Sequence, residues 1–120
     1  MLAKKDILLI ESSKDIIRKN FDSVNWCHTV GAAVLTDTGN IYFAVNVDAD
    51  KKSVCAEYIA IGMAISNGER VFQKIVAVYG KDKQEVIPPC EYCKNMLNEY
   101  APSIMVILSE EKEICLTELL

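Results

Sequence analysis

Long apolar runs are missing from this chain of 120 residues. The longest candidate, residues 58–66, is far shorter than the roughly 18 residues that a membrane helix needs. Near the N-terminus, Lys4 and Lys5 are followed only by the short apolar stretch 7–10 before Glu11, so the pattern of a secretory signal is absent as well. We therefore expect no membrane partner and a cytoplasmic location.

Proline, glycine and positive charge are also scarce. Three Pro and five Gly exclude a collagen-like or low-complexity chain. A formal net charge of −4 argues against a protein that grips nucleic acid by its phosphates, so no nucleic-acid partner is expected. With 51% hydrophobic residues, no internal repeat and no long linker, residues 1–120 are predicted to form a single domain.

The apolar pattern alternates between helical and extended periods. It predicts helices over residues 3–20, 55–66 and 90–100 and strands over 29–35, 41–47, 75–79 and 104–108, with a closing turn at 117–120. Residues 36–40 read as the turn of a hairpin between the first two strands. Strands alternating with helices in the second half indicate βαβ crossovers, with 75–79 as a buried parallel strand. The predicted fold is α/β, a three-layer α/β/α sandwich on a mixed sheet with helices on both faces.

Helix 55–66 is apolar nearly all round, which predicts that it is buried.

Five cysteines are many for such a chain, and clustered cysteines in the cytosol are more often metal ligands or reactive thiols than disulfides. Cys90 and Cys93 form a C-x-x-C motif at an expected helix start, so both sulfurs can reach one metal ion. Cys55 falls at another helix start, where free N–H groups favour a thiolate. Three thiolates predict a Zn²⁺ site, and a water in the fourth position would make it catalytic.

Glu57 follows Cys55 by two residues, which places a carboxylate beside the open position of that metal. Such a group can take a proton from water and pass it to a leaving amine, and Zn²⁺ lowers the pKa of its water from about 15.7 toward roughly 7. A thiol-redox pair at Cys90 and Cys93 would need neither Cys55 nor Glu57, and a structural zinc would not need Glu57. The combination therefore favours a catalytic zinc.

These motifs, Cys55-Ala56-Glu57 followed by Pro89-Cys90-Glu91-Tyr92-Cys93, resemble the cytidine deaminase family, whose signature is that of the zinc deaminases. The likeness covers roughly residues 28–120. Segments 30–35 and 41–47 look like the family's first strand and the strand that leads into its nucleoside-binding segment. Segments 60–68, 75–78 and 100–102 are similar to the bacterial blasticidin-S deaminase branch.

The resemblance implies a cytidine deaminase-like fold, one Zn²⁺ per chain on Cys55, Cys90 and Cys93, and hydrolytic deamination of a cytosine ring. Water would attack C4, Glu57 would carry protons to N3 and the amine, and ammonia would leave. A set of three cysteine ligands resembles the enzymes that act on free nucleosides, whereas editors of nucleic acid use a histidine as first ligand.

Four substrate contacts carry over by position. Asn46 would hydrogen-bond the ribose hydroxyl, and the backbone N–H of Ala56 would hold the pyrimidine O2. Asp48 stands where the family has Glu; because Asp is one methylene shorter, either the sugar sits deeper or the contact is lost. His28 occupies the place of an aromatic residue that stacks on the base.

Two further departures lie beside the metal ligands. Glu91 replaces the family's usual Gly, and Lys94 replaces its usual Arg. Three thiolates on Zn²⁺ leave a net charge of −1, which Lys94 would soften without the bidentate fork of Arg.

The resemblance leaves three outcomes open. The favoured reaction converts cytidine or deoxycytidine into uridine or deoxyuridine; the alternatives are a cytosine nucleoside antibiotic such as blasticidin S, or a zinc-stabilised binding module without turnover. Related deaminases continue past the position of Leu120 with a tail that helps wall the pocket, so substrate choice stays open. Small deaminases of this type are tetramers, which implies a homo-oligomer here.

Overall fold

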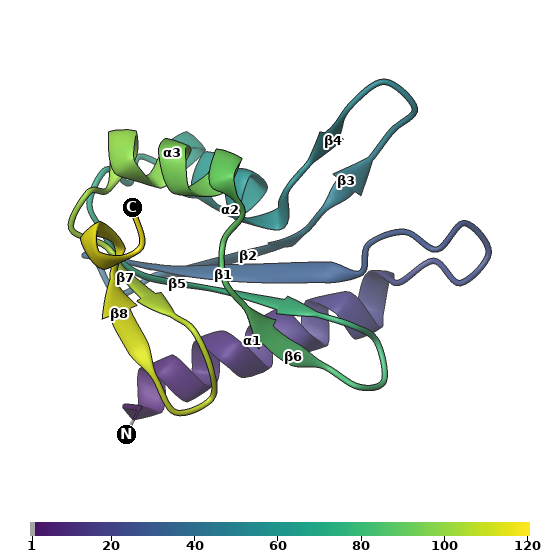
Figure 1. Cartoon of the computed structure of the whole chain (residues 1–120), viewed down its shortest axis with the longest axis horizontal. Helices are drawn as coiled ribbons and strands as arrows, with labels where there is room; N and C mark the ends of the chain where they lie inside the picture. Colours follow the sequence, from purple (N-terminus) through teal and green to yellow (C-terminus); the bar gives the residue numbers. More distant parts are fainter. Residues whose placement is uncertain (1) are drawn as a thin grey trace.

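The chain folds into a mixed sheet between two layers of helices (Figure 1). The structure is a computed structural model and describes residues 2–120. Helix α1 (Lys4–Asn20) covers one face of the sheet, and helices α2 (Ala56–Ser66) and α3 (Glu91–Tyr100) lie together on the other. The predicted three-layer α/β/α sandwich with helices on both faces is confirmed.

Within residues 2–120, six strands form the main sheet. Its bounds and order are β2 (Ile41–Val45), β1 (Val30–Thr36), β5 (Phe72–Tyr79), β7 (Met105–Ile107) and β8 (Glu113–Cys115), with β6 (Glu85–Ile87) paired to β5 beside this path. The predicted β1–β2 hairpin is present, and its last pair is Leu35 with Ile41. Of all the neighbours, β5 and β7 alone run parallel.

The crossovers differ in part from the expectation. Helix α3 leads to β7, which pairs in parallel with β5 as a βαβ unit should. Helix α2 connects β2 to β5 across β1, which is antiparallel to both strands, and β6 forms an antiparallel pair with β5. The prediction of a parallel strand at 75–79 therefore holds only at the start of the strand, where Ile75 pairs with Val106, because residues 77–79 pair antiparallel with β6.

Alternate residues of the central strands feed two separate cores, because both faces of the sheet are covered. Ala32 and Val34 of β1 pack toward α2 and α3, whereas Ala33 and Leu35 pack toward α1. Helix α1 approaches β1 so closely that a Cβ at Gly31 would collide with the backbone oxygen of Ser13. The glycine thus sets the distance between this helix and the sheet.

Among the strands of two or three residues that the structure describes, β7 was predicted, within 104–108, and four others were not predicted as separate strands. They are the hairpin β3 (Val47–Asp48) with β4 (Ser53–Val54), and the three-residue strands β6 and β8; the 3₁₀ turn η1 (Leu116–Glu118) follows. Two or three residues are too few to show an alternating pattern. In the described part of the chain, no helix combines the length and the apolar character needed to cross a bilayer.

Helix α2 departs from the prediction of complete burial. Ala60 and Ala64 face the core, but Tyr58 and Met63 are 43% and 41% exposed.

Candidate metal centre and substrate cavity

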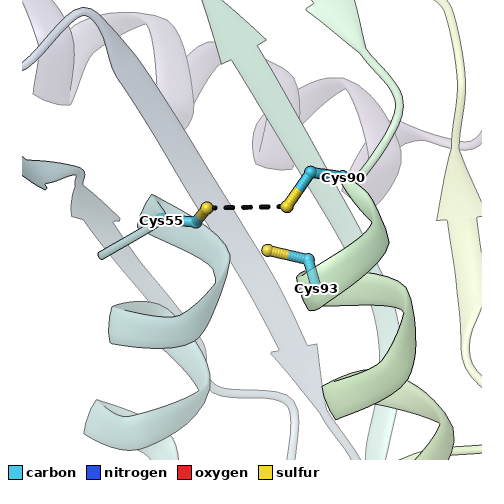
Figure 2. A group of neighbouring side chains, drawn as sticks. All are labelled: Cys55, Cys90 and Cys93. Carbon is cyan, nitrogen blue, oxygen red and sulfur yellow. Dashed lines mark hydrogen bonds between the residues drawn. The ribbon is translucent and has the colours of Figure 1, made fainter. Parts of the chain in front are cut away.

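Three cysteine sulfurs converge between the first turns of α2 and α3, as predicted (Figure 2). Cys55 and Cys90 are the residues immediately before the two helices, and Cys93 lies in the first turn of α3. The sulfurs lie within 4.8 Å of one another, and those of Cys55 and Cys90 are 3.6 Å apart. The two other cysteines, Cys27 and Cys115, lie outside this group and are half-buried.

The donor set fits Zn²⁺. Tetrahedral ligands at the Zn–S distance of about 2.3 Å place sulfurs about 3.8 Å apart, close to the spacing of Cys55 and Cys90. Soft thiolates are ligands that select zinc. In the protein alone, burial raises the pKa of Cys55 and of Cys93, and the negative charge of Glu57 raises the pKa of Cys93 further. A divalent cation would relieve this crowding of negative charge.

Cys90 differs from its two neighbours. Burial acts to raise its pKa, but hydrogen bonds from the backbone N–H and the side chain of Cys93 lower it below the usual value of a thiol. The backbone N–H of Cys93 is available because it lies in the first turn of α3, where the amides have no partner within the helix. The most exposed of the three sulfurs is therefore the one most easily ionised.

Glu57 lies in the first turn of α2 and is 5% exposed. Burial raises the pKa of its carboxyl group above the usual range. Burying a carboxylate next to metal-binding thiols costs free energy, which points to a functional role. A raised pKa suits a group that both accepts and gives protons near neutral pH.

A cavity of about 240 Å³ opens beside the three cysteines. Its lining includes Cys55, Cys90, Ala56 and Glu57. Its other lining residues come from the start of β1, the β2–β3 link, the β3–β4 hairpin, the end of β6 and the residue after it: Val30, Asn46, Asp48, Ser53, Val54, Ile87 and Pro88. Three of the four expected substrate contacts, Asn46, Asp48 and Ala56, are thus brought together with the metal ligands.

Asn46 is held from several sides at the link between β2 and β3. Its backbone N–H donates to the Val30 oxygen at 3.1 Å, and its Oδ1 accepts from the Val30 N–H at 3.0 Å. Its Nδ2 donates to Oδ2 of Asp48 at 3.0 Å. The amide and the carboxylate therefore act as one preorganised pair in the lining of the cavity.

His28, the fourth expected contact, is not among the residues that line this cavity. Its Nδ1 lies 2.8 Å from the backbone oxygen of Asn46. Lys94 is also engaged, because its Nζ lies 2.9 Å from Oε1 of Glu91 in the same helix. Glu91 thus offsets part of the positive charge that Lys94 was expected to bring to the metal centre.

Residues 8–109 match the family described as the cytidine and deoxycytidylate deaminase zinc-binding region. Together with the three-cysteine centre, this match makes the protein a zinc-dependent deaminase, a hydrolase. The chain belongs to the cytidine and deoxycytidylate deaminase family.

Individual relatives agree with this assignment. The chain is 36% identical over 115 residues to blasticidin-S deaminase of Bacillus cereus, and this alignment covers 89% of this chain and 81% of that enzyme. It is 32% identical over 80 residues to cytidine deaminase of Sporosarcina psychrophila, and this alignment covers 65% of this chain and 57% of that enzyme.

Solved structures share the fold. Cytidine deaminase from Burkholderia pseudomallei superposes with a TM-score of 0.79 at 26% identity, covering 99% of this chain and 97% of that one. Cytidine deaminase from Mycobacterium tuberculosis gives a TM-score of 0.81 at 23% identity, covering 99% and 95%.

Proposed function

We propose that the protein hydrolyses the exocyclic amine of the cytosine ring in a free nucleoside, converting cytidine or deoxycytidine into uridine or deoxyuridine and ammonia. The observation that carries this proposal is that two groups line one cavity. Cys55, Cys90 and the buried Glu57 form the first group, with the sulfur of Cys93 within 4.8 Å of the other two sulfurs, and the hydrogen-bonded pair Asn46 and Asp48 forms the second. The first group suits hydrolysis, and the second suits the hydroxyls of a sugar.

Zn²⁺ on Cys55, Cys90 and Cys93 would supply the polarisation that makes water a nucleophile at neutral pH. We assign the proton transfers to Glu57. Its carboxyl group lines the cavity next to the cysteines, and burial raises its pKa toward the range in which a carboxyl group both accepts and donates protons. It would take the proton of the attacking water and deliver protons to N3 and to the departing amine.

The base and the sugar would be held by groups with unused hydrogen-bonding capacity. Ala56 is the first residue of α2, and the N–H groups at a helix start have no acceptor within the helix. Its N–H is available to the pyrimidine O2. One N–H of Asn46 Nδ2 and the Oδ1 of Asp48 are available to a sugar hydroxyl. His28 belongs to this group through its bond to Asn46.

A second candidate within the same chemistry is a cytosine nucleoside antibiotic such as blasticidin S. The 36% identity to blasticidin-S deaminase over 89% of the chain favours it. The shorter Asp48 carboxylate does so too, because it leaves more room at the sugar end than the Glu of the cytidine enzymes.

We expect the protein to work as a homo-oligomer, a tetramer by the family resemblance. The exposed side of α2, with Tyr58 and Met63, supports this, since an apolar helix face needs a partner. The same surface borders a second hollow of about 460 Å³, lined by Lys52, Ser53, Val54, Cys55, Tyr58 and Tyr92. A cytoplasmic location would keep the five cysteines, all free, in the reduced state that metal binding requires.

The test combines metal analysis with turnover. Zinc per chain is measured first, and the ultraviolet loss of cytidine, deoxycytidine and blasticidin S is then followed with the wild type, Glu57→Ala and the surface control Glu99→Gln. We expect zinc near one per chain and turnover that drops at least about a hundredfold in Glu57→Ala alone. The preferred substrate chooses between the two candidates. Zinc without turnover of any of the three compounds would contradict the proposal.

A further inference from the structure

We propose that His28 is a positioning residue for sugar recognition: its imidazole holds the Asn46–Asp48 pair in place instead of stacking on the cytosine base. The inference rests on the proposed function, in which Asn46 and Asp48 bind a sugar hydroxyl.

The contact with Asn46 defines which nitrogen of the His28 ring carries the proton. The backbone oxygen of Asn46, 2.8 Å from Nδ1 of His28, can only accept a hydrogen bond. Nδ1 must therefore carry the proton, and in the neutral ring Nε2 is left without one. With this bond, the backbone N–H, the backbone oxygen and both side-chain polar atoms of Asn46 have partners. Val30 holds Asn46 from one side, and the histidine holds it from the other.

The backbone at His28 supports a local anchoring role. Its φ of 63° lies in the left-handed region, which Asn, Asp and His adopt more readily than other residues with a side chain. Phe, which the family resemblance would place here, is disfavoured in this conformation. Such a conformation persists only where surrounding contacts hold it, and the bond to Asn46 is one of them.

The loop that carries His28 is braced at its other end. The backbones of Asp22 and Cys27 exchange two hydrogen bonds of 3.1 Å, and the Asp22 carboxylate accepts from two N–H groups of the turn between them. The ring of Trp26 packs edge-on against Phe21, with 5.0 Å between the centroids. Residues 22–28 therefore form a firm support from which His28 reaches the β2–β3 link.

Two substitutions separate positioning from stacking. In His28→Asn, Nδ2 stands where Nδ1 stood, and Asn tolerates the positive φ, but no aromatic ring remains. His28→Phe restores the aromatic ring of the family and removes the donor. Positioning predicts that His28→Phe raises KM for cytidine about tenfold with little change in kcat, and that His28→Asn stays within about threefold of the wild type. Stacking predicts the opposite order.

The substrate supplies a further control. 2′,3′-Dideoxycytidine keeps the base but lacks the ring hydroxyls that Asn46 and Asp48 would bind. Its KM should be the same for the wild type and both variants if His28 acts through the sugar site. A loss of dideoxycytidine binding in His28→Phe as large as that of cytidine would overturn the proposal. Val24→Ala, a change of an exposed side chain in the same loop away from Asn46, should leave KM unchanged, and zinc content and melting temperature check that each variant is folded.

A spectroscopic measurement tests the contact without turnover. His28 is the single histidine of the chain, so its imidazole ¹⁵N signals are unambiguous. At a pH at which the ring is neutral, we expect the proton on Nδ1, and a ring protonated on Nε2 with Nδ1 bare would overturn the inference. If the wild type deaminates no cytosine nucleoside, the proposed function and the sugar role fail together, whereas the tautomer still reports whether His28 holds Asn46.

Discussion

The sulfurs of Cys55 and Cys90 lie 3.6 Å apart, although 35 positions separate the two residues along the chain. Each stands immediately before a different helix, and those helices lie on the same face of the sheet (Figures 1 and 2). The metal centre therefore exists only when the strands between them have taken their places, and it reports directly on the completed fold.

Cys90→Ser should abolish stoichiometric zinc binding. A hydroxyl is a far poorer ligand for Zn²⁺ than a thiolate, and Cys90 is the most readily ionised of the three cysteines. Metal analysis after dialysis against a weak chelator measures the loss. The matched control, Cys115→Ser, changes a half-buried thiol outside the centre and should keep one zinc per chain. Equal zinc in both variants would contradict the assigned ligand set.

Lys74→Met should lower the free energy of unfolding by about 3 kcal/mol, because it leaves two carboxylates without their shared cation. Lys74 Nζ lies 2.8 Å from Asp6 Oδ1 and 3.0 Å from Glu113 Oε2, and the Asp6 side chain is only 2% exposed. These ion pairs join α1, β5 and β8.

Urea denaturation measures this change. The control, Arg18→Met, breaks the exposed pair with Asp15 and should cost less than about 1 kcal/mol. Similar losses in the two variants would show that the Lys74 cluster behaves like a surface pair.

Glu69→Gln should destabilise the protein at neutral pH and much less in acid. The Glu69 carboxylate accepts hydrogen bonds from Asn40, Thr38 and Tyr42, and these bonds hold its pKa below the usual value. A carboxyl group with a lowered pKa in the folded state contributes stability above its unfolded pKa and loses that contribution as the pH falls through the folded one.

Melting temperatures of the wild type and Glu69→Gln, compared between pH 7 and pH 3, give the measurement. The gap between the two proteins should narrow as the solution is acidified below about pH 4.5, the region in which a glutamate ordinarily takes up its proton. A gap that stays constant with pH would show that the effect comes from shape and not from charge.

Met63→Glu should reduce the size of the assembly. Met63 is 41% exposed on the apolar helix α2, so a charge there leaves the chain's own core intact but would be buried in an interface between copies. Sedimentation velocity follows the change, with Val71→Glu, at another exposed apolar position, as the control. A wild type that sediments as a monomer and turns over substrate would refute the oligomer proposal.

The helices, the hairpin and the metal ligands could be predicted from the sequence because their signals are local. Cys90 and Cys93 are three residues apart at a helix start, the periodic apolar positions of α1 extend over several turns, and α2 is largely one apolar run. The position of Glu57 follows from that of Cys55, since Cys55 immediately precedes α2 and Glu57 lies in its first turn.

The rest depends on tertiary contacts that leave little trace in the sequence. β6 is only three residues long, and its pairing with β5 is what brings Ile87 and Pro88 to the cavity. The hydrogen bond from His28 to Asn46 joins a loop without a periodic pattern to the end of a strand. It depends on the positive φ of His28, which the sequence does not indicate because no glycine stands next to it. The exposure of Met63 likewise depends on which side of α2 the sheet covers.

A metal ion held between residues 55 and 90 is also a cross-link. It closes a loop of the chain much as a disulfide would, and chain-entropy arguments value a covalent closure of this length at about 4 kcal/mol. The ion that activates water would therefore also tie together α2 and α3, the two crossover helices of the sheet. Metal loss should loosen α2 from α3 before it disturbs α1, whose apolar cluster lies on the opposite face.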